Sequence, residues 1–192
     1  VAGKGGPEFD RSSVFASQES LNFYALCALA ISAPCVVRFN GGTRLKSESL
    51  NDLNTILEDF QARQVSLVPG SDGVPVRVES SGFIPEVVHI PETASRELLT
   101  ALMFLGPVWA QRKGSVRLEL SGEGQWPVAA ARAFEVWEQI GVSWESDERL
   151  ITLSAEDFHL PQSPHSSLDP LLSAYLLVMP AFHGGEVTLR GV

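Results

Sequence analysis

Three basic side chains lie close together in the sequence, where they could bind an anion. Arg38 lies in a short apolar run, and Arg44 and Lys46 come directly before a predicted helix that begins at Ser47. The first backbone N–H groups of a helix have no partner inside the helix, so a phosphate group binds there readily. A phosphate site at this helix start is one hypothesis. The alternative is a solvated basic surface, which Glu48 in the first turn favours because it already supplies the negative charge that suits a helix start.

The cysteines and histidines do not follow a spacing typical of a metal or nucleophile site. Cys27 and Cys35 are expected in a buried helix and in the strand after it, where a free thiol behaves as a small apolar side chain. His159 and His165 flank a loop rich in Pro and Ser, and without a fixed Cys or carboxylate nearby they are weak evidence for a metal. No nucleotide-binding, serine-hydrolase or zinc-peptidase motif is present, so we expect no cofactor and no metal. We interpret all four histidines as structural or solvated: His89, His159, His165 and His183.

The composition is typical of a globular protein. The chain has 192 residues, of which 44% are hydrophobic and 19% charged, enough for one substantial core or two small ones. Its net charge of -9 argues against nucleic acid or an anionic membrane as a partner. The longest apolar runs, such as 24–31, are far shorter than the roughly 20 residues of a membrane span, and no signal peptide is found. We therefore expect a cytoplasmic protein.

The central part of the chain, 86–154, predicts alternating strands and helices. The expected elements are a strand, a helix, a strand, a helix and a strand pair, at 87–90, 95–110, 115–120, 127–140, 142–145 and 150–154. The first of these helices is almost wholly apolar, which predicts burial on several faces, and the second is amphipathic. Their order defines one βαβαββ unit.

The same order recurs on both sides of the central unit. Before it we expect a helix with Ser17 or Ser20 as its N-cap, a strand, an amphipathic helix and a hairpin, at 17–32, 35–39, 47–63, 65–68 and 74–78. After it come an apolar helix at 168–182 and a strand at 186–190. The three apolar helices begin roughly 75 residues apart, a period that suits one such unit.

The predicted fold class is therefore α/β, built from βαβαββ repeats with an incomplete third unit. Residues 1–9 have the composition of a scar left by expression cloning, and 10–192 are expected to form a single domain with units at about 17–79, 86–154 and 160–192. The alternative is a single α/β sheet without a true repeat.

Four segments resemble motifs of one enzyme family. Segment 20–57 resembles a stretch in which G-T-x-x-R-x-L leads one helix and R-M-x-x-R-P the next. Segments 93–107 and 127–145 resemble S-S-Q-x-x-S-A-L-L-M-x-A-P and P-Y-x-x-x-T-x-x-x-M-x-x-F-G-V, and 166–192 resembles D-x-S-S-A-x-Y-F-L-A-A-A-A followed by G-G-x-V-x-V-x-G. The chain thus resembles the enolpyruvyl transferases, specifically the 5-enolpyruvylshikimate-3-phosphate (EPSP) synthases. The resemblance implies an inverse α/β barrel domain in which buried helices pack together inside outer sheets.

The resemblance also implies that several substrate-binding residues are replaced. The family's two arginines that contact phosphoenolpyruvate fall on Tyr24 and Glu48. From the S-S-Q motif, which holds the shikimate phosphate, only Ser95 is kept, because Arg96 and Glu97 follow it. A site for two anions needs convergent Arg and Lys side chains, and these positions offer a phenol and two carboxylates.

Three residues keep the family pattern and are the candidate substrate-binding residues: Ser95, Arg44 and Asp169. The family's K-S-x-S-N-R loop has no match, and its proton-transfer residues belong to a second domain without a counterpart here. We expect an EPSP synthase-like domain with a degenerate site, not catalytic alone, that is a fragment or one half of a 3-phosphoshikimate 1-carboxyvinyltransferase of the shikimate pathway. The alternative is a non-enzymatic protein-interaction domain. The expected partners are an anion like shikimate-3-phosphate and, at the open C-terminal end, a second domain, a partner chain or a second copy.

Overall fold

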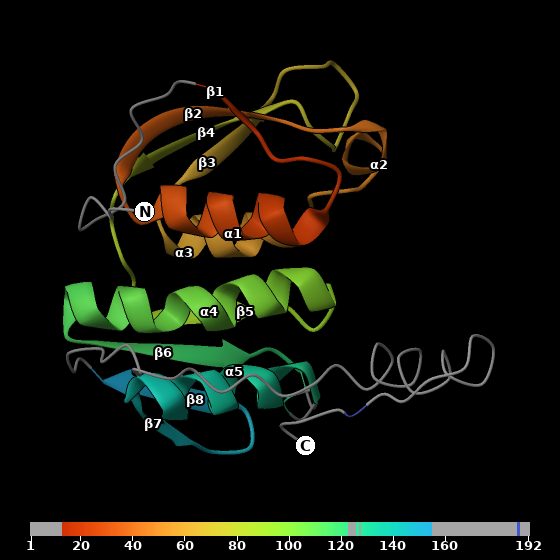
Figure 1. The fold of residues 1–192 in the computed structure, drawn as a ribbon. Coiled ribbons are helices and arrows are strands. Elements are labelled where there is room, and N and C mark those ends of the chain that lie inside the picture. Colours follow the sequence, from red (N-terminus) through yellow and green to blue (C-terminus); the bar gives the residue numbers. More distant parts are fainter. Residues whose placement is uncertain (1–12, 123–125, 127, 155–187, 189–192) are drawn as a thin grey trace. The chain divides into compact units, whose positions relative to one another are not determined.

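Two four-stranded sheets and the helices between them make up the first part of the chain (Figure 1). The computed structural model describes residues 13–122, 126, 128–154 and 188. The contacts of the chain divide it into two units, Val1–Phe158 and His159–Val192, and all the described helices and strands belong to the first. The predicted third helix and strand, and with them Asp169, lie outside the described residues.

The first sheet has the strand order β1-β2-β4-β3, in which β1 is parallel to β2 and the other neighbours are antiparallel. Its strands are β1 (Ser13–Phe15), β2 (Pro34–Asn40), β3 (Arg63–Ser66) and β4 (Val76–Ser81). Three helices accompany it: α1 (Ser20–Ile31), α2 (Thr43–Lys46) and α3 (Asp52–Asp59).

The second sheet repeats this arrangement with the order β5-β6-β8-β7, and again only its first pair of strands is parallel. Its strands are β5 (Val87–Ile90), β6 (Ser115–Leu120), β7 (Ser143–Ser146) and β8 (Leu150–Ser154), and its helices are α4 (Arg96–Lys113) and α5 (Val128–Ile140). The predicted α/β fold is confirmed in the described residues, which contain two sheets of equal topology.

The two apolar helices α1 and α4 pack against each other between the sheets (Figure 1). Each lies on the inner face of its own sheet, so little of either surface is left to water. Phe23, Leu102 and Trp109 are fully buried there. Gly106 allows the close approach of α4 to its sheet, because a Cβ at this position would lie 2.6 Å from Leu153 Cδ1. These contacts explain why both helices are apolar on several faces.

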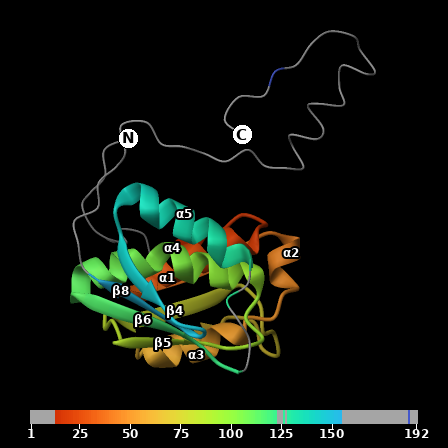
Figure 2. The ribbon, with the colours of Figure 1, turned by 90° about the horizontal axis from the view of Figure 1, so that it is seen from below.

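Helices α3 and α5 lie beside this helix pair (Figure 2). Helix α5 packs against α4, where Phe134, Trp137 and Trp144 form an aromatic cluster with Phe134 stacked on Trp144 at 4.4 Å. Helix α3 lies along the edge strand β5 of the second sheet. No helix among the described residues is long and apolar enough to cross a membrane.

Three local predictions were wrong. The helix expected at 47–63 is shorter, because α2 ends before that range, at Lys46, and α3 within it spans only Asp52–Asp59. Strand β1 was not expected, and the residue before α1 is Glu19, which makes no side-chain capping bond. By contrast, Ser95 does cap α4, and its Oγ accepts the Leu98 N–H at 3.1 Å.

Candidate functional site

The starts of α1 and α4 lie next to each other, close to α2, and bring together five polar side chains. We call this group the helix-start cluster: Ser20, Tyr24, Arg44, Glu48 and Ser95. A side-chain hydrogen bond joins Tyr24 of α1 to Ser95 at the start of α4. The Ser20 hydroxyl donates to Glu48 Oε2 at 2.5 Å, which links the start of α1 to the chain after α2. The cluster therefore contains two of the three predicted site residues, Arg44 and Ser95.

Arg44 faces carboxylates rather than an open anion site. Its Nε lies 3.7 Å from Glu48 Oε1, and its Nη1 lies 3.8 Å from Glu19 Oε2. The Arg44 side chain is 63% exposed, so each ion pair is weak, about 0–1 kcal/mol. The one guanidinium of the cluster is thus shared between two acids of the same chain.

The hypothesis of a phosphate site at a helix beginning at Ser47 is not supported, because no helix begins there. Ser47 is the C-cap of α2, and its backbone N–H donates to the Arg44 and Leu45 carbonyls. A helix C-terminus carries partial negative charge, which suits the basic side chains Arg44 and Lys46 in the last turn but not an added anion. Arg38 lies elsewhere, on the exposed face of β2.

Tyr24 remains a neutral phenol at physiological pH. Its side chain is buried, and this burial raises the pKa of Tyr24 above its ordinary value of 10. The hydrogen bond with Ser95 opposes the rise, whereas the negative charges of Glu48, Asp52 and Glu97 add to it. Three acids therefore lie near a neutral hydroxyl, and a fourth, Glu19, faces Arg44. The cluster can offer hydroxyl groups and carboxylates to a ligand but little positive charge.

The pH dependence of stability should reveal this environment. Above pH 10 the unfolded chain loses its Tyr24 proton before the folded chain does, so unfolding becomes easier as the pH rises from 10 towards the raised pKa. Tyr24→Phe removes this group and should lose less stability than the wild type between pH 9 and 11. At neutral pH the variant should cost about 0.5–1.5 kcal/mol, because the bond to Ser95 is lost. Urea unfolding at several pH values measures both effects, and parallel curves for the two proteins would contradict the assignment.

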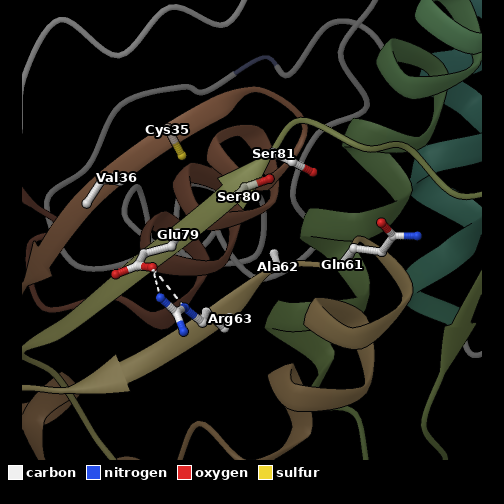
Figure 3. Close-up of a pocket in the computed structure, with 8 residues that line it drawn as sticks. All are labelled: Cys35, Val36, Gln61, Ala62, Arg63, Glu79, Ser80 and Ser81. Carbon is white, nitrogen blue, oxygen red and sulfur yellow. Dashed lines mark hydrogen bonds and ion pairs between the residues drawn. The ribbon is translucent and has the colours of Figure 1, made fainter.

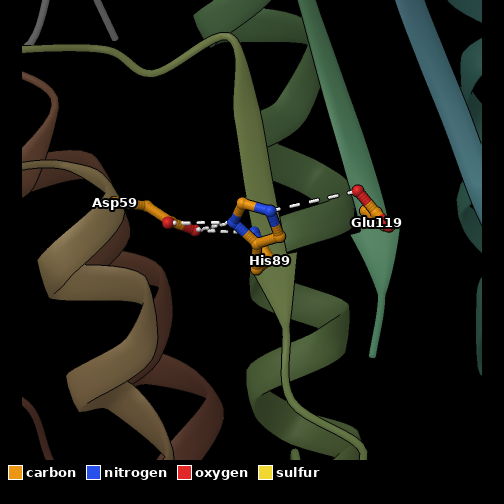
Figure 4. Close-up of polar contacts among 3 residues, drawn as sticks. All are labelled: Asp59, His89 and Glu119. Atoms are coloured by element: carbon orange, nitrogen blue, oxygen red, sulfur yellow. Dashed lines mark hydrogen bonds and ion pairs between the residues drawn. The ribbon is translucent and has the colours of Figure 1, made fainter. Parts of the chain in front are cut away.

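His89 pairs with acidic side chains at the junction of α3 and β5 (Figure 4). Its backbone N–H donates to Asp59 Oδ2 at 2.6 Å, and its Nδ1 lies 3.0 Å from Asp59 Oδ1. On its other side, Nε2 lies 3.9 Å from Glu119 Oε2. A second bond, from Thr93 Oγ1 to Asp52 Oδ1 at 2.8 Å, ties the start of α3 to the chain after β5. The contacts of His89 thus join α3 to the second sheet, which agrees with the interpretation of this histidine as structural.

The thiols and acidic groups do not form a metal or nucleophile site in the described part of the chain. Cys27 and Cys35 are free, and burial raises the pKa of the Cys27 thiol to about 12. Burial also raises the pKa of Cys35, whose Sγ donates to the Ala30 carbonyl at 3.2 Å. Among the described residues, no group of three or more His, Cys, Asp or Glu side chains is arranged to hold a metal ion.

Ser20 was the polar residue of the cluster that sequence reasoning did not single out as a site residue. It was considered only as a helix cap, and its bond to Glu48 joins residues 28 positions apart. Nothing in the local sequence indicates a contact of this range. Asp169, the third predicted site residue, lies outside the described residues.

Comparison with known proteins finds one kind of enzyme that is similar to this chain in sequence and in fold. No protein-family model matches the chain. The 3-phosphoshikimate 1-carboxyvinyltransferase of Shewanella amazonensis is 24% identical over 194 residues, which cover 99% of this chain and 44% of that protein. The protein of the same name from Sulfurovum is 21% identical over 196 residues, covering 100% of this chain and 45% of that protein.

The structural comparison agrees with the sequence comparison. The solved EPSP synthase from Acinetobacter baumannii matches with a TM-score of 0.57 at 12% identity, over 78% of this chain and 32% of that chain. This likeness confirms the predicted EPSP synthase-like α/β fold. The chain spans less than half the length of the curated relatives it matches. In sequence and in fold the chain is thus similar to part of the EPSP synthases, as a divergent or truncated member of that family would be.

Proposed function

We propose that the chain is an EPSP synthase-like domain with a degenerate substrate site, which does not catalyse enolpyruvyl transfer on its own. The observation that carries this proposal is the Glu48 carboxylate in the helix-start cluster, 2.5 Å from Ser20 Oγ and 3.7 Å from Arg44 Nε. By resemblance, the family has an arginine at the position of Glu48. A carboxylate there repels the phosphate and carboxylate groups of both substrates.

The surroundings of Glu48 support the same conclusion. Glu19, Asp52 and Glu97 add negative charge, and Tyr24 is neutral where the family has its other arginine. Arg44 is the basic residue of the cluster, and its guanidinium already faces two carboxylates. Tight binding of a phosphate ester requires several charge-assisted hydrogen bonds from Arg or Lys. The one guanidinium of the cluster faces Glu48 and Glu19, and Asp52 and Glu97 lie near Tyr24, so a dianion should bind weakly or not at all.

Titration calorimetry with shikimate-3-phosphate tests this proposal. We expect no saturable heat from the wild-type chain at millimolar ligand. Glu48→Arg should introduce binding, because it removes the repelling charge, releases Arg44 and adds a second guanidinium. The affinity of Glu48→Arg should exceed that of the wild type by about tenfold or more. Tenfold corresponds to about 1.4 kcal/mol, which is modest for a substitution that changes the local charge by two units.

The matched control is Glu58→Arg, which makes the same change of net charge at an exposed position of α3. It should not introduce binding. Saturable binding of shikimate-3-phosphate to the wild-type chain would overturn the proposal, as would equal gains in the two variants, because the local charge of the cluster would then not be decisive.

A second candidate function is a non-enzymatic protein-interaction domain that reuses the scaffold. It is favoured by two apolar side chains on the outer face of the first sheet, Phe15 and Val36, which are 67% and 60% exposed. Large apolar side chains at this level of exposure on one face are common at protein interfaces. Absence of substrate binding together with binding of a peptide to this face would favour the second candidate.

A further inference from the structure

The outer face of the first sheet carries an excess of positive charge, although the chain as a whole has a net charge of -9. Three arginines project from neighbouring strands on this face: Arg38 of β2, Arg77 of β4 and Arg63 of β3. Glu79 of β4 is the acid among them. The strand register places Arg38 directly opposite Arg77, and Glu79 directly opposite Arg63. We call these four residues the arginine face.

The carboxylate of Glu79 pairs with two of the three arginines. Glu79 Oε2 accepts from Arg63 Nε at 2.8 Å and from Arg63 Nη2 at 2.5 Å (Figure 3). Glu79 Oε1 lies 2.7 Å from Arg77 Nε. The hydrogen bonds and positive charge of Arg63, and to a smaller extent those of Arg77, hold the pKa of Glu79 below its ordinary value. Arg38 makes no ion pair or hydrogen bond in the described part of the chain. Two positive charges are therefore left over on this face.

The opposed pair Arg38 and Arg77 is unfavourable for the isolated domain. Like charges directly opposite each other on one face of an antiparallel pair destabilise the sheet. A bound anionic group between the two guanidinium groups would remove this repulsion and use the fork geometry with which arginine recognises carboxylates. The pair therefore indicates an anionic partner for this face.

Apolar side chains and a hollow lie beside the arginines. Phe15 and Val36 are exposed on the same face, and Val65 lies opposite Arg77. A hollow of about 490 Å³ adjoins Val36, lined by Cys35, Val36, Gln61, Ala62, Arg63, Glu79, Ser80 and Ser81 (Figure 3). Its thiol and the Ser80 hydroxyl already donate to the backbone, to the Ala30 and Ile31 carbonyls, so the hollow suits an uncharged side chain.

We propose that the arginine face docks an acidic, extended segment of a partner protein in which a carboxylate and an apolar side chain are two residues apart. The carboxylate lies between Arg38 and Arg77, and the apolar side chain enters the hollow beside Val36 and Ala62. Alternate residues of an extended peptide point to the same side, so both of these side chains can face the sheet. The rest of the chain is acidic, so an acidic segment is attracted to the arginine face and repelled by the remaining surface. The proposal goes beyond the enolpyruvyl transferase relationship and does not depend on it.

Fluorescence anisotropy with a labelled peptide that repeats Glu-Ser-Leu-Ser tests the docking, because its glutamates and leucines lie on one side when the peptide is extended. The wild-type chain should bind this peptide and not one that repeats Lys-Ser-Leu-Ser. Arg38→Glu should weaken binding about tenfold or more, because it sets like charges against each other in the complex. Binding should also weaken when the salt concentration rises. In the free protein Arg38→Glu faces Arg77 with the opposite charge, so its thermal midpoint should equal or exceed that of the wild type.

The matched control is Arg117→Glu, at an exposed position in the middle of β6 in the second sheet. Its change of net charge is the same, and peptide affinity should stay within about twofold of the wild type. Val36→Ser is a second variant that keeps all charges and should weaken binding through the hollow. Equal weakening by Arg38→Glu and Arg117→Glu, absence of peptide binding, or binding of single-stranded DNA as tightly as the peptide would each overturn the proposal.

Discussion

Replacing Leu102 by alanine is expected to lower the free energy of unfolding by about 2–5 kcal/mol. Leu102 is fully buried on α4, the helix that packs against α1 on one side and against the second sheet on the other. Truncation removes apolar contacts with both neighbours and leaves a cavity that the two packed layers cannot easily close. The effect should exceed that of a typical point substitution, because it acts at the junction of the two sheet-and-helix units.

Phe104→Ala is the matched control for this experiment. Phe104 lies two residues further along α4 and is 44% exposed, so a larger side chain is removed from a less buried position. Its substitution should cost well under half as much as Leu102→Ala. Urea denaturation of the three proteins gives the comparison, provided that the slopes of the transitions agree. If Leu102→Ala left the midpoint unchanged, or cost less than Phe104→Ala, the helix pair would not be the centre of the core.

The sequence predicts the second sheet-and-helix unit well because its local patterns agree with its tertiary environment. Strands β5 and β6 begin and end where the alternation of apolar and polar residues predicts. Helix α4 begins directly after Ser95, where the helix start was predicted, and the apolar character of α4 reflects contacts on two sides. In each case the residues that specify the element are the residues within it.

The helix predicted at 47–63 fails because distant parts of the chain compete for its ends. The Leu50 N–H donates to the Asp72 carbonyl at 3.1 Å, so it is not available for a helix. Close packing of Gly73 on the Lys46 carbonyl holds this segment, since a Cβ at Gly73 would lie 2.6 Å from that oxygen. At the other end Gln61 adopts a positive φ of 50° and ends the helix. The apolar residues of 47–63 keep a helical spacing throughout, but these tertiary contacts determine the backbone conformation of the segment.

The candidate site was predictable as a list of residues but not as an arrangement. The resemblance pointed to Tyr24, Glu48 and Ser95. The contacts that decide its charge, Ser20 with Glu48 and Tyr24 with Ser95, join residues that no local pattern relates. The shift in the pKa of Tyr24 likewise depends on burial between two helices and on acids from three separate segments.

The chain by itself is expected to release no phosphate from phosphoenolpyruvate and shikimate-3-phosphate. The reaction must hold two anions together, protonate a carbon and remove a proton from a hydroxyl group. In the helix-start cluster Glu48 opposes the first requirement. For the second, the resemblance assigns proton transfer to a second domain of the family, and this chain spans less than half the length of the relatives it matches. Each well-placed acid or base contributes about 10²–10⁴-fold, so losing more than one removes turnover from the measurable range.

Tyr24→Arg combined with Glu48→Arg separates binding from chemistry. The new guanidinium groups would lie near Asp52 and Glu97, whose charges now raise the pKa of Tyr24. The double variant should bind shikimate-3-phosphate better than the wild type and still release no phosphate, because positive charge does not supply the missing acid and base. A coupled phosphate assay with purified protein, compared with a no-protein control, measures this. Phosphate release proportional to the amount of wild-type chain would show that the 192 residues contain a working site, and release by the double variant alone would show that only the anion-binding residues had been lost.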